Sequence, residues 1–225
     1  GIGVASLVLL VVLSYIQTIL HYPDGGGSYT VAKDNLGKVP SLLAAAALLT
    51  DYVLTVSVSI SAGIRAVTSA LPELFPYRVW IALIILLLIT WVNLRGVRES
   101  GTIFAIPTYA FIVGVLAVIG IGLLRYFGIF GLAPMEVTPH LVKAQVDATG
   151  FLFIWLILRA FAGGCTALTG IEAISNGVKA FKKPEAKNAA TTMVVMGVTA
   201  MTLFIGITFL ATHLNLVPEE AESIL

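Results

Sequence analysis

The chain has 225 residues, of which 58% are hydrophobic and 11% are charged, and its formal net charge is +1. Soluble domains usually carry about 25% charged residues, so this chain has too little charge to cover a water-exposed surface. The composition excludes a disordered chain, a secreted disulfide scaffold and a nucleic-acid-binding protein with a basic surface. The single cysteine, Cys165, excludes an internal disulfide and offers no metal cluster. We therefore predict an integral protein of the lipid bilayer.

A helix needs about 20 largely apolar residues to cross the hydrocarbon core of a membrane. Several stretches of the chain meet this requirement, and short connections join them. In chain order, the predicted spans are residues 2–20, 39–64, 79–94, 103–124, 151–173 and 191–214. The sequence therefore predicts an all-α fold, a multi-pass transmembrane helical bundle that forms a single domain over residues 1–225.

The first span lies at the start of the chain, where a signal peptide is the competing interpretation. It is preceded by no initiator methionine and no basic segment, so we interpret it as a true span within a longer protein. Basic residues are more numerous in the first, third and fifth connections than in the second and fourth. The odd-numbered connections are therefore predicted to be cytoplasmic, and an odd number of spans is expected to precede the first one.

The fifth predicted span has an unusual centre, because residues 163–170 read Gly-Gly-Cys-Thr-Ala-Leu-Thr-Gly. Glycine costs about 1 kcal/mol relative to alanine inside a helix, so we expect a broken helix near residues 163–172. Interrupted helices at membrane depth are typical of binding sites in secondary transporters. The alternative is a face of small side chains that lets two helices pack closely. The small residues concerned are Gly163, Cys165, Ala167 and Gly170.

Two acidic residues, Asp51 and Glu172, lie within predicted spans. A charge there costs about 2.5–3.5 kcal/mol on insertion scales, which indicates a function. At about 100° per residue, Asp51, Thr55 and Ser59 share one stripe of their helix, with Tyr52 beside it. The alternative for the hydroxyls is donation to the carbonyl four residues earlier. Carboxylate, hydroxyl and freed carbonyl oxygens together suit a hard cation.

Two opposing effects act on Glu172. In the first turn of a helix that restarts near Gly170, the helix dipole favours an ionised carboxylate. Burial in a medium of low dielectric favours the neutral acid instead. A carboxylate held between these effects can bind and release a proton, so Asp51 and Glu172 are our candidates for proton coupling.

Other motifs predict no catalysis. Residues 25–28 read Gly-Gly-Gly-Ser and lack the following Gly-Lys-Ser/Thr of a phosphate-binding loop. We interpret them as a short loop that lets the backbone approach neighbouring helices. No Ser/His/Asp or Cys/His arrangement has a soluble scaffold on which to lie, so we expect no enzyme and no cofactor.

Three segments resemble the amino acid-polyamine-organocation (APC) superfamily of secondary transporters. Tyr22-Pro-Asp-Gly-Gly-Gly-Ser-Tyr29 resembles the loop after the second helix of that superfamily, and Asn93-Leu-Arg-Gly-Val-Arg-Glu-Ser-Gly101 resembles the loop after its fourth. Thr169-Gly-Ile-Glu-Ala173 resembles its unwound sixth helix. The resemblance covers almost the whole chain. It implies part of a LeuT-like inverted-repeat fold, a fragment that holds about helices two to seven.

A narrower resemblance is to the potassium importers of the KUP family, and among them to the KimA-type bacterial members. Their third helix carries Asp-Tyr followed by Thr and Ser, and their sixth carries Thr-Gly-Ile/Val-Glu. This resemblance implies proton-coupled potassium uptake across the cytoplasmic membrane of a bacterium, and it allows a homodimer. The implied ion ligands are Asp51, Tyr52, Thr55, Ser59, Thr169 and Glu172.

Two other functions compete with potassium uptake. An acid after the sixth-helix glycine also occurs in amino-acid permeases, so proton-coupled uptake of an amino acid or a polyamine is the first alternative. An anionic Glu172 would repel the carboxylate of an amino acid but not a polyamine. The second alternative is a structural or regulatory membrane subunit, whose function would not depend on Asp51 and Glu172.

Overall fold

A computed structural model of the chain describes residues 2–129 and 150–214, and every regular element among them is a helix. The elements are α1 (Ile2–His21), α2 (Gly27–Leu36), α3 (Lys38–Ala70), η1 (Pro72–Tyr77), α4 (Arg78–Leu94), α5 (Val97–Tyr126), α6 (Phe151–Gly164), η3 (Cys165–Leu168), α7 (Glu172–Asn176), η4 (Val178–Ala180) and α8 (Glu185–His213). The prediction of an all-α fold is confirmed for these residues.

Five helical stretches are long and apolar enough to cross a membrane, judged by length and composition over the described residues. They are α1, α3, η1 together with α4, the part of α5 from Gly101 to Tyr126, and α8. At 33 residues, α3 is about 50 Å long. That length exceeds the roughly 30 Å of a hydrocarbon core, so α3 must tilt or extend beyond it.

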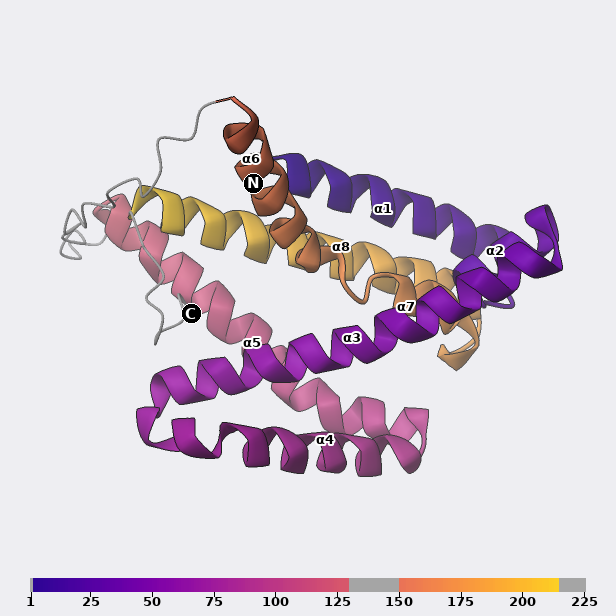
Figure 1. Cartoon of the computed structure of the whole chain (residues 1–225), viewed down its shortest axis with the longest axis horizontal. Coiled ribbons are helices and arrows are strands. Elements are labelled where there is room, and N and C mark those ends of the chain that lie inside the picture. Colours follow the sequence, from indigo (N-terminus) through magenta and orange to yellow (C-terminus); the bar gives the residue numbers. More distant parts are fainter. Residues whose placement is uncertain (1, 130–149, 215–225) are drawn as a thin grey trace. The chain divides into compact units, whose positions relative to one another are not determined.

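The fifth predicted span is divided in the structure. The apolar helix α6 has 14 residues, which is shorter than the roughly 20 needed to cross a bilayer. A 3₁₀ turn, an irregular stretch and the short helix α7 follow it (Figure 1). The chain therefore crosses this region as two helical pieces, as the glycine-rich sequence predicts.

The described helices form two compact units, and each is described by itself. The first unit comprises residues 2–45, 119–129 and 150–214, and the second comprises residues 46–118. Helices α3 and α5 each contribute residues to both units.

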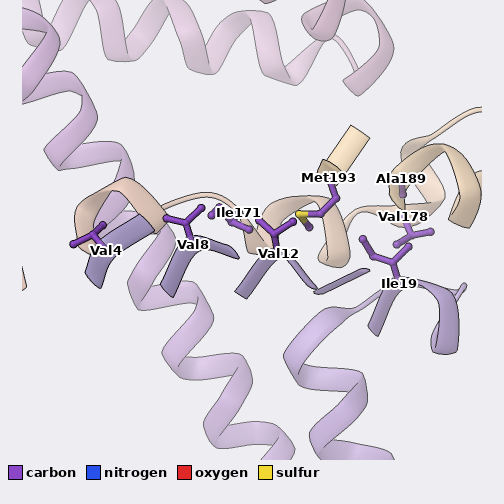
Figure 2. Close-up of a cluster of buried hydrophobic side chains, with 8 residues drawn as sticks. All are labelled: Val4, Val8, Val12, Ile19, Ile171, Val178, Ala189 and Met193. Carbon is purple, nitrogen blue, oxygen red and sulfur yellow. The ribbon is translucent and has the colours of Figure 1, made fainter. Parts of the chain in front are cut away.

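The core of the first unit lies where α1 packs along α8. Figure 2 shows its buried apolar side chains, which come from α1, α8 and the segments before and after α7. They are Val4, Val8, Val12, Ile19, Ile171, Val178, Ala189 and Met193. The first three repeat at every fourth position and so lie on one side of α1. This face holds both α8 and the segment after the break in place.

Glycines let the helices of the first unit approach one another closely. A Cβ at Gly197 of α8 would lie 2.9 Å from a methyl carbon of Val12, and one at Gly164 would lie 2.7 Å from a methyl carbon of Val4. Association of helices in lipid depends on such close packing, because lipid chains are as apolar as the helices themselves.

The second unit carries most of its apolar side chains on its surface. None of the most apolar window of α3 is buried, and Ile64 and Thr68 near its end are the buried residues of this helix within the second unit. Together with η1 and α4, this end of α3 lines a cavity of about 360 Å³. The Arg78 guanidinium lies 4.2 Å from the centroid of the Phe75 ring, in a cation–π contact.

We predict that Gly197→Ala destabilises the first unit by about 1–3 kcal/mol, the usual cost of overpacking a core. The new Cβ would meet Val12, whose branched side chain is stiff in a helix. The matched control is Gly120→Ala, because no atom lies within 4 Å of the Cβ position of Gly120. Thermal unfolding of the full-length parent in detergent measures the difference. Equal melting temperatures for the two variants would contradict the close approach, and Val12→Ala should restore the stability of Gly197→Ala.

Candidate functional site

The first set of predicted site residues lies on α3. The helix is continuous through Asp51, Tyr52, Thr55 and Ser59. Its geometry therefore places the carboxylate and the two hydroxyls on one stripe, with successive Cα atoms about 6 Å apart. Asp51 and Ser59 are exposed within the described chain, whereas Tyr52 and Thr55 are half-buried.

Hydrogen bonds distinguish the hydroxyls of this stripe from those of their neighbours. Thr50, Ser57 and Ser61 each donate to the carbonyl oxygen four residues earlier, at 2.7–2.9 Å. Within the part of the chain that the structure describes, Thr55 and Ser59 donate no such bond. Donation to the carbonyl four residues earlier therefore accounts for the hydroxyls of these neighbours. It does not account for Thr55 and Ser59, whose hydroxyl oxygens are available to a ligand.

The length of the stripe limits what one ion can contact. Asp51 and Ser59 are eight residues apart, which is about 12 Å along the helix axis. Oxygen ligands of a hard cation lie only about 2.3–2.6 Å from it in calcium sites. One cation can therefore contact Asp51 and Thr55, or Thr55 and Ser59, but not both ends. The stripe is a row of two adjacent positions.

The second set, Thr169 and Glu172, lies at the break between α6 and α7. Thr169 is extended (φ −60°, ψ 128°) and Gly170 has a left-handed φ of 87°. The break retains backbone hydrogen bonds of its own. The Thr169 N–H donates to the Thr166 carbonyl oxygen at 3.1 Å, and the Ile171 N–H donates to the Leu168 carbonyl oxygen at 3.2 Å. Two tight turns therefore replace the helical ladder.

The glycines of the broken span serve different purposes. No atom lies within 4 Å of the Cβ positions of Gly163 and Gly170, so neither is required for close packing within the described chain. Gly170 is required by its backbone, since a positive φ is unfavourable for other residues. Close packing instead involves Gly164. Within the residues that the structure describes, the small-residue alternative therefore does not account for Gly163 and Gly170.

Glu172 is the first residue of α7 and is half-buried. It lies in the first turn, as predicted, although a helix of five residues has a small dipole. Its neighbours are fixed on both sides. Ile171 is 4% exposed and belongs to the core of the first unit, and the buried Ser175 hydroxyl donates to the Glu172 carbonyl oxygen at 3.0 Å. The hydroxyl of Thr169, by contrast, is exposed and makes no hydrogen bond within the described chain.

The structure thus gathers the predicted ligands into two sets, one in each compact unit. Together they offer two carboxylates, three aliphatic hydroxyls and one phenol. In the described residues, no three His, Cys, Asp or Glu side chains come together to hold a metal ion. The carboxylates, hydroxyls and phenol of the two sets are all oxygen donors, which are typical of sites for alkali or alkaline-earth cations rather than for transition metals.

Sequence reasoning missed α2 and the ion pair that connects the α1–α2 loop to η4. Lys179 donates to Asp24 at 2.9 Å, with the two side chains 65% and 86% exposed. This hydrogen bond, assisted by the attraction between the charges, raises the pKa of Lys179 above 10.5. Lys179 therefore stays charged at neutral pH, and its contribution to the pair is lost when the pH rises through that higher value. At this exposure the pair is strongly screened by solvent.

A multi-pass helical membrane protein with one helix broken at membrane depth has the architecture of a secondary transporter. The chain belongs to the amino acid permease family, whose model matches residues 1–218. It is 45% identical over 224 residues to the potassium transporter KimA of Bacillus subtilis. That match covers 100% of this chain and 36% of the relative, so the chain spans about a third of the relative's length. The resemblance to KimA-type members of the APC superfamily is confirmed.

We predict opposite effects of two alanine substitutions in the broken span. Gly170→Ala should cost about 1–2 kcal/mol, because it forces an L-residue into the left-handed region. Gly163→Ala should stabilise by up to about 1 kcal/mol, because Gly163 is helical and its Cβ position is open. Thermal unfolding of the purified full-length parent compares them. A Gly170→Ala variant as stable as the wild type would show that the break does not need this backbone conformation.

Proposed function

We propose that this chain is the part of a proton-coupled potassium importer that supplies the ion ligands of its third and sixth helices. The observation that carries the proposal is the row of oxygens on α3, where Thr55 and Ser59 keep their hydroxyls free of the back-bonds that their neighbours make. The name of the similar protein, a potassium transporter, supports the choice of ion.

A potassium ion that leaves water needs oxygens in place of its hydration shell. On this proposal, Asp51 and Thr55 contact the ion first, with the phenol of Tyr52 beside them. Ser59 offers the adjacent position along the same row. Thr169 and Glu172 supply oxygens from the broken helix, whose interrupted backbone is the usual location of ion ligands in such carriers.

Charge balance provides the reason for proton coupling. An ionised carboxylate in the membrane is costly unless it is paired, and this chain places two carboxylates, Asp51 and Glu172, in its two sets of ligands. One bound cation neutralises one of them. A proton neutralises the other, so that the carrier can change conformation without burying the charge of either carboxylate.

Uptake of a polyamine or an amino acid by the same fold is the second candidate, and the description of the matching family as an amino acid permease favours it. Two carboxylates suit the ammonium groups of a polyamine. They suit a free amino acid less well, because its own carboxylate would meet Glu172. In either case we expect a carrier without enzymatic activity.

The decisive experiment measures rubidium uptake, as a surrogate for potassium, by proteoliposomes that hold the full-length parent. It is run with and without an inward proton gradient, for the wild type and for Glu172→Gln. Gradient-driven uptake that Glu172→Gln abolishes is the expected result. Uptake of a labelled polyamine or amino acid without rubidium flux would refute the potassium assignment. Transport that survives Asp51→Asn combined with Glu172→Gln would support the structural-subunit alternative.

A matched pair of threonines tests the row on α3. We predict that Thr55→Val raises the KM for rubidium about tenfold, because the variant lacks one oxygen ligand of the ion. Thr50→Val is the control, since Thr50 donates to the Ala46 carbonyl oxygen and valine has the same shape. The KM of Thr50→Val should stay within about twofold of the wild type, because its hydroxyl is already occupied. Equal KM values for the two variants would contradict a ligand role for Thr55.

A further inference from the structure

The loop between α1 and α2 lies against the second piece of the broken helix. We name residues 22–27, which comprise this loop and the first residue of α2, the glycine loop, and residues 172–180, which hold α7 and η4, the α7–η4 segment. The Gly26 N–H donates to the Asn176 carbonyl oxygen at 3.2 Å. A Cβ at Gly25 would lie 3.1 Å from that same oxygen and 3.4 Å from the backbone nitrogen of Val178. The two backbones are therefore in direct contact.

Gly27 extends this contact to side chains. A Cβ at Gly27 would overlap the Asn176 side-chain oxygen and would lie 3.1 Å from the Ser175 hydroxyl oxygen. Gly25, Gly26 and Gly27 all have positive φ angles, of 79°, 89° and 45°. Substitution of Gly25 or Gly27 would thus disturb both the path of the loop and its fit against the α7–η4 segment, and substitution of Gly26 would disturb the path of the loop.

The glycine loop is itself well ordered, which makes it a firm support. The Gly25 N–H donates to the Tyr22 carbonyl oxygen at 3.0 Å, and the Thr30 hydroxyl donates to the Gly25 carbonyl oxygen at 3.0 Å. The loop also continues directly from α1, whose Ile19 is 1% exposed in the core of the first unit. Movement of the α7–η4 segment away from the loop would break its contacts with Gly25, Gly26 and Gly27 together.

The two pieces of the broken helix are attached to α1 in different ways. The first piece meets α1 through side chains, where Val4 packs on Gly164 and Phe161 lies next to Gly3. The second piece is held at its far end by backbone contacts with the glycine loop. The stretch between them has open space at Gly170. Ile171, next to Gly170, is buried in the core of the first unit, so that core and the glycine loop together anchor the second piece.

We propose that Gly25, Gly26 and Gly27 are positioning residues for Glu172. By holding the α7–η4 segment against the end of α1, they fix the orientation in which the Glu172 carboxylate meets a cation. This role rests on the proposed cation transport. The contact itself does not, so the two can be tested separately.

Gly25→Ala and Gly37→Ala form the matched pair for the test. Gly37 also has a left-handed φ, of 91°, but no atom lies within 4 Å of its Cβ position. Both substitutions strain the backbone, and Gly25→Ala alone places a methyl group against the α7–η4 segment. Hydrogen–deuterium exchange of the full-length parent follows the amides of this segment. Exchange should become about tenfold faster in Gly25→Ala than in Gly37→Ala.

Rubidium uptake by the same two variants tests whether the glycine loop positions Glu172. We expect Gly25→Ala to raise the KM about tenfold and to leave kcat less affected, because ligand geometry is disturbed while the rest of the carrier is intact. Gly37→Ala should change neither parameter. A compensating pair provides a further check, since Asn176→Ala removes the group that a methyl at Gly27 would overlap. Gly27→Ala should therefore be less harmful in the Asn176→Ala background than alone.

Three results would overturn the inference. Equal exchange in Gly25→Ala and Gly37→Ala would refute the contact. Faster exchange with an unchanged KM would show that the glycine loop is structural and does not position Glu172. Absence of rubidium uptake by the wild type would refute the proposed function and the positioning role with it. If the two variants still differed in hydrogen–deuterium exchange, the contact would stand and only the proposed function would be wrong.

Discussion

The interruption of a helix at membrane depth is the constraint on which the first unit depends. Backbone groups that leave the helical ladder find no water in the hydrocarbon core, so an irregular stretch is tolerated only where protein surrounds it or lines a cavity. Here α1 provides that support along its length. It packs on α6 near Val4, on Ile171 near Val12, and on the α7–η4 segment through its last turn and the glycine loop. Helix α8 covers the same face of α1 and completes the core.

The two sets of candidate ligands have different surroundings for a physical reason. Glu172 follows a buried isoleucine and is half-buried itself, because the turn that carries it belongs to a packed core. Asp51 and Ser59 lie on a regular helix that is exposed along most of its length. A regular helix leaves no backbone group for an ion, so its contribution comes from side chains. The break can contribute backbone as well as side-chain oxygens, and two kinds of element thus offer two kinds of ligand.

Much of this arrangement follows from local sequence. The break could be predicted because the cost of glycine in a helix is a local property, and the stripe on α3 could be predicted because helical periodicity fixes which side chains share a face. Local sequence does not distinguish Thr50 from Thr55, however, although only the first back-bonds in the described chain. Nor does it show which helix the glycine loop approaches. That partner lies about 150 residues further along the chain, at Asn176, and such long-range contacts leave no periodic pattern.

Glycine has two physical functions in the first unit, and its position relative to the break decides which one applies. Gly164 and Gly197 lie inside helices and are needed for the space that their missing side chains leave to Val4 and Val12. Gly170 lies in the break and is needed for its φ angle, with open space around it. Gly25 combines both, because a left-handed residue there also touches the backbone of the α7–η4 segment. The first unit thus uses glycine for space where helices and loops pack closely, and for backbone conformation at Gly170, whose neighbour Ile171 is held in the core.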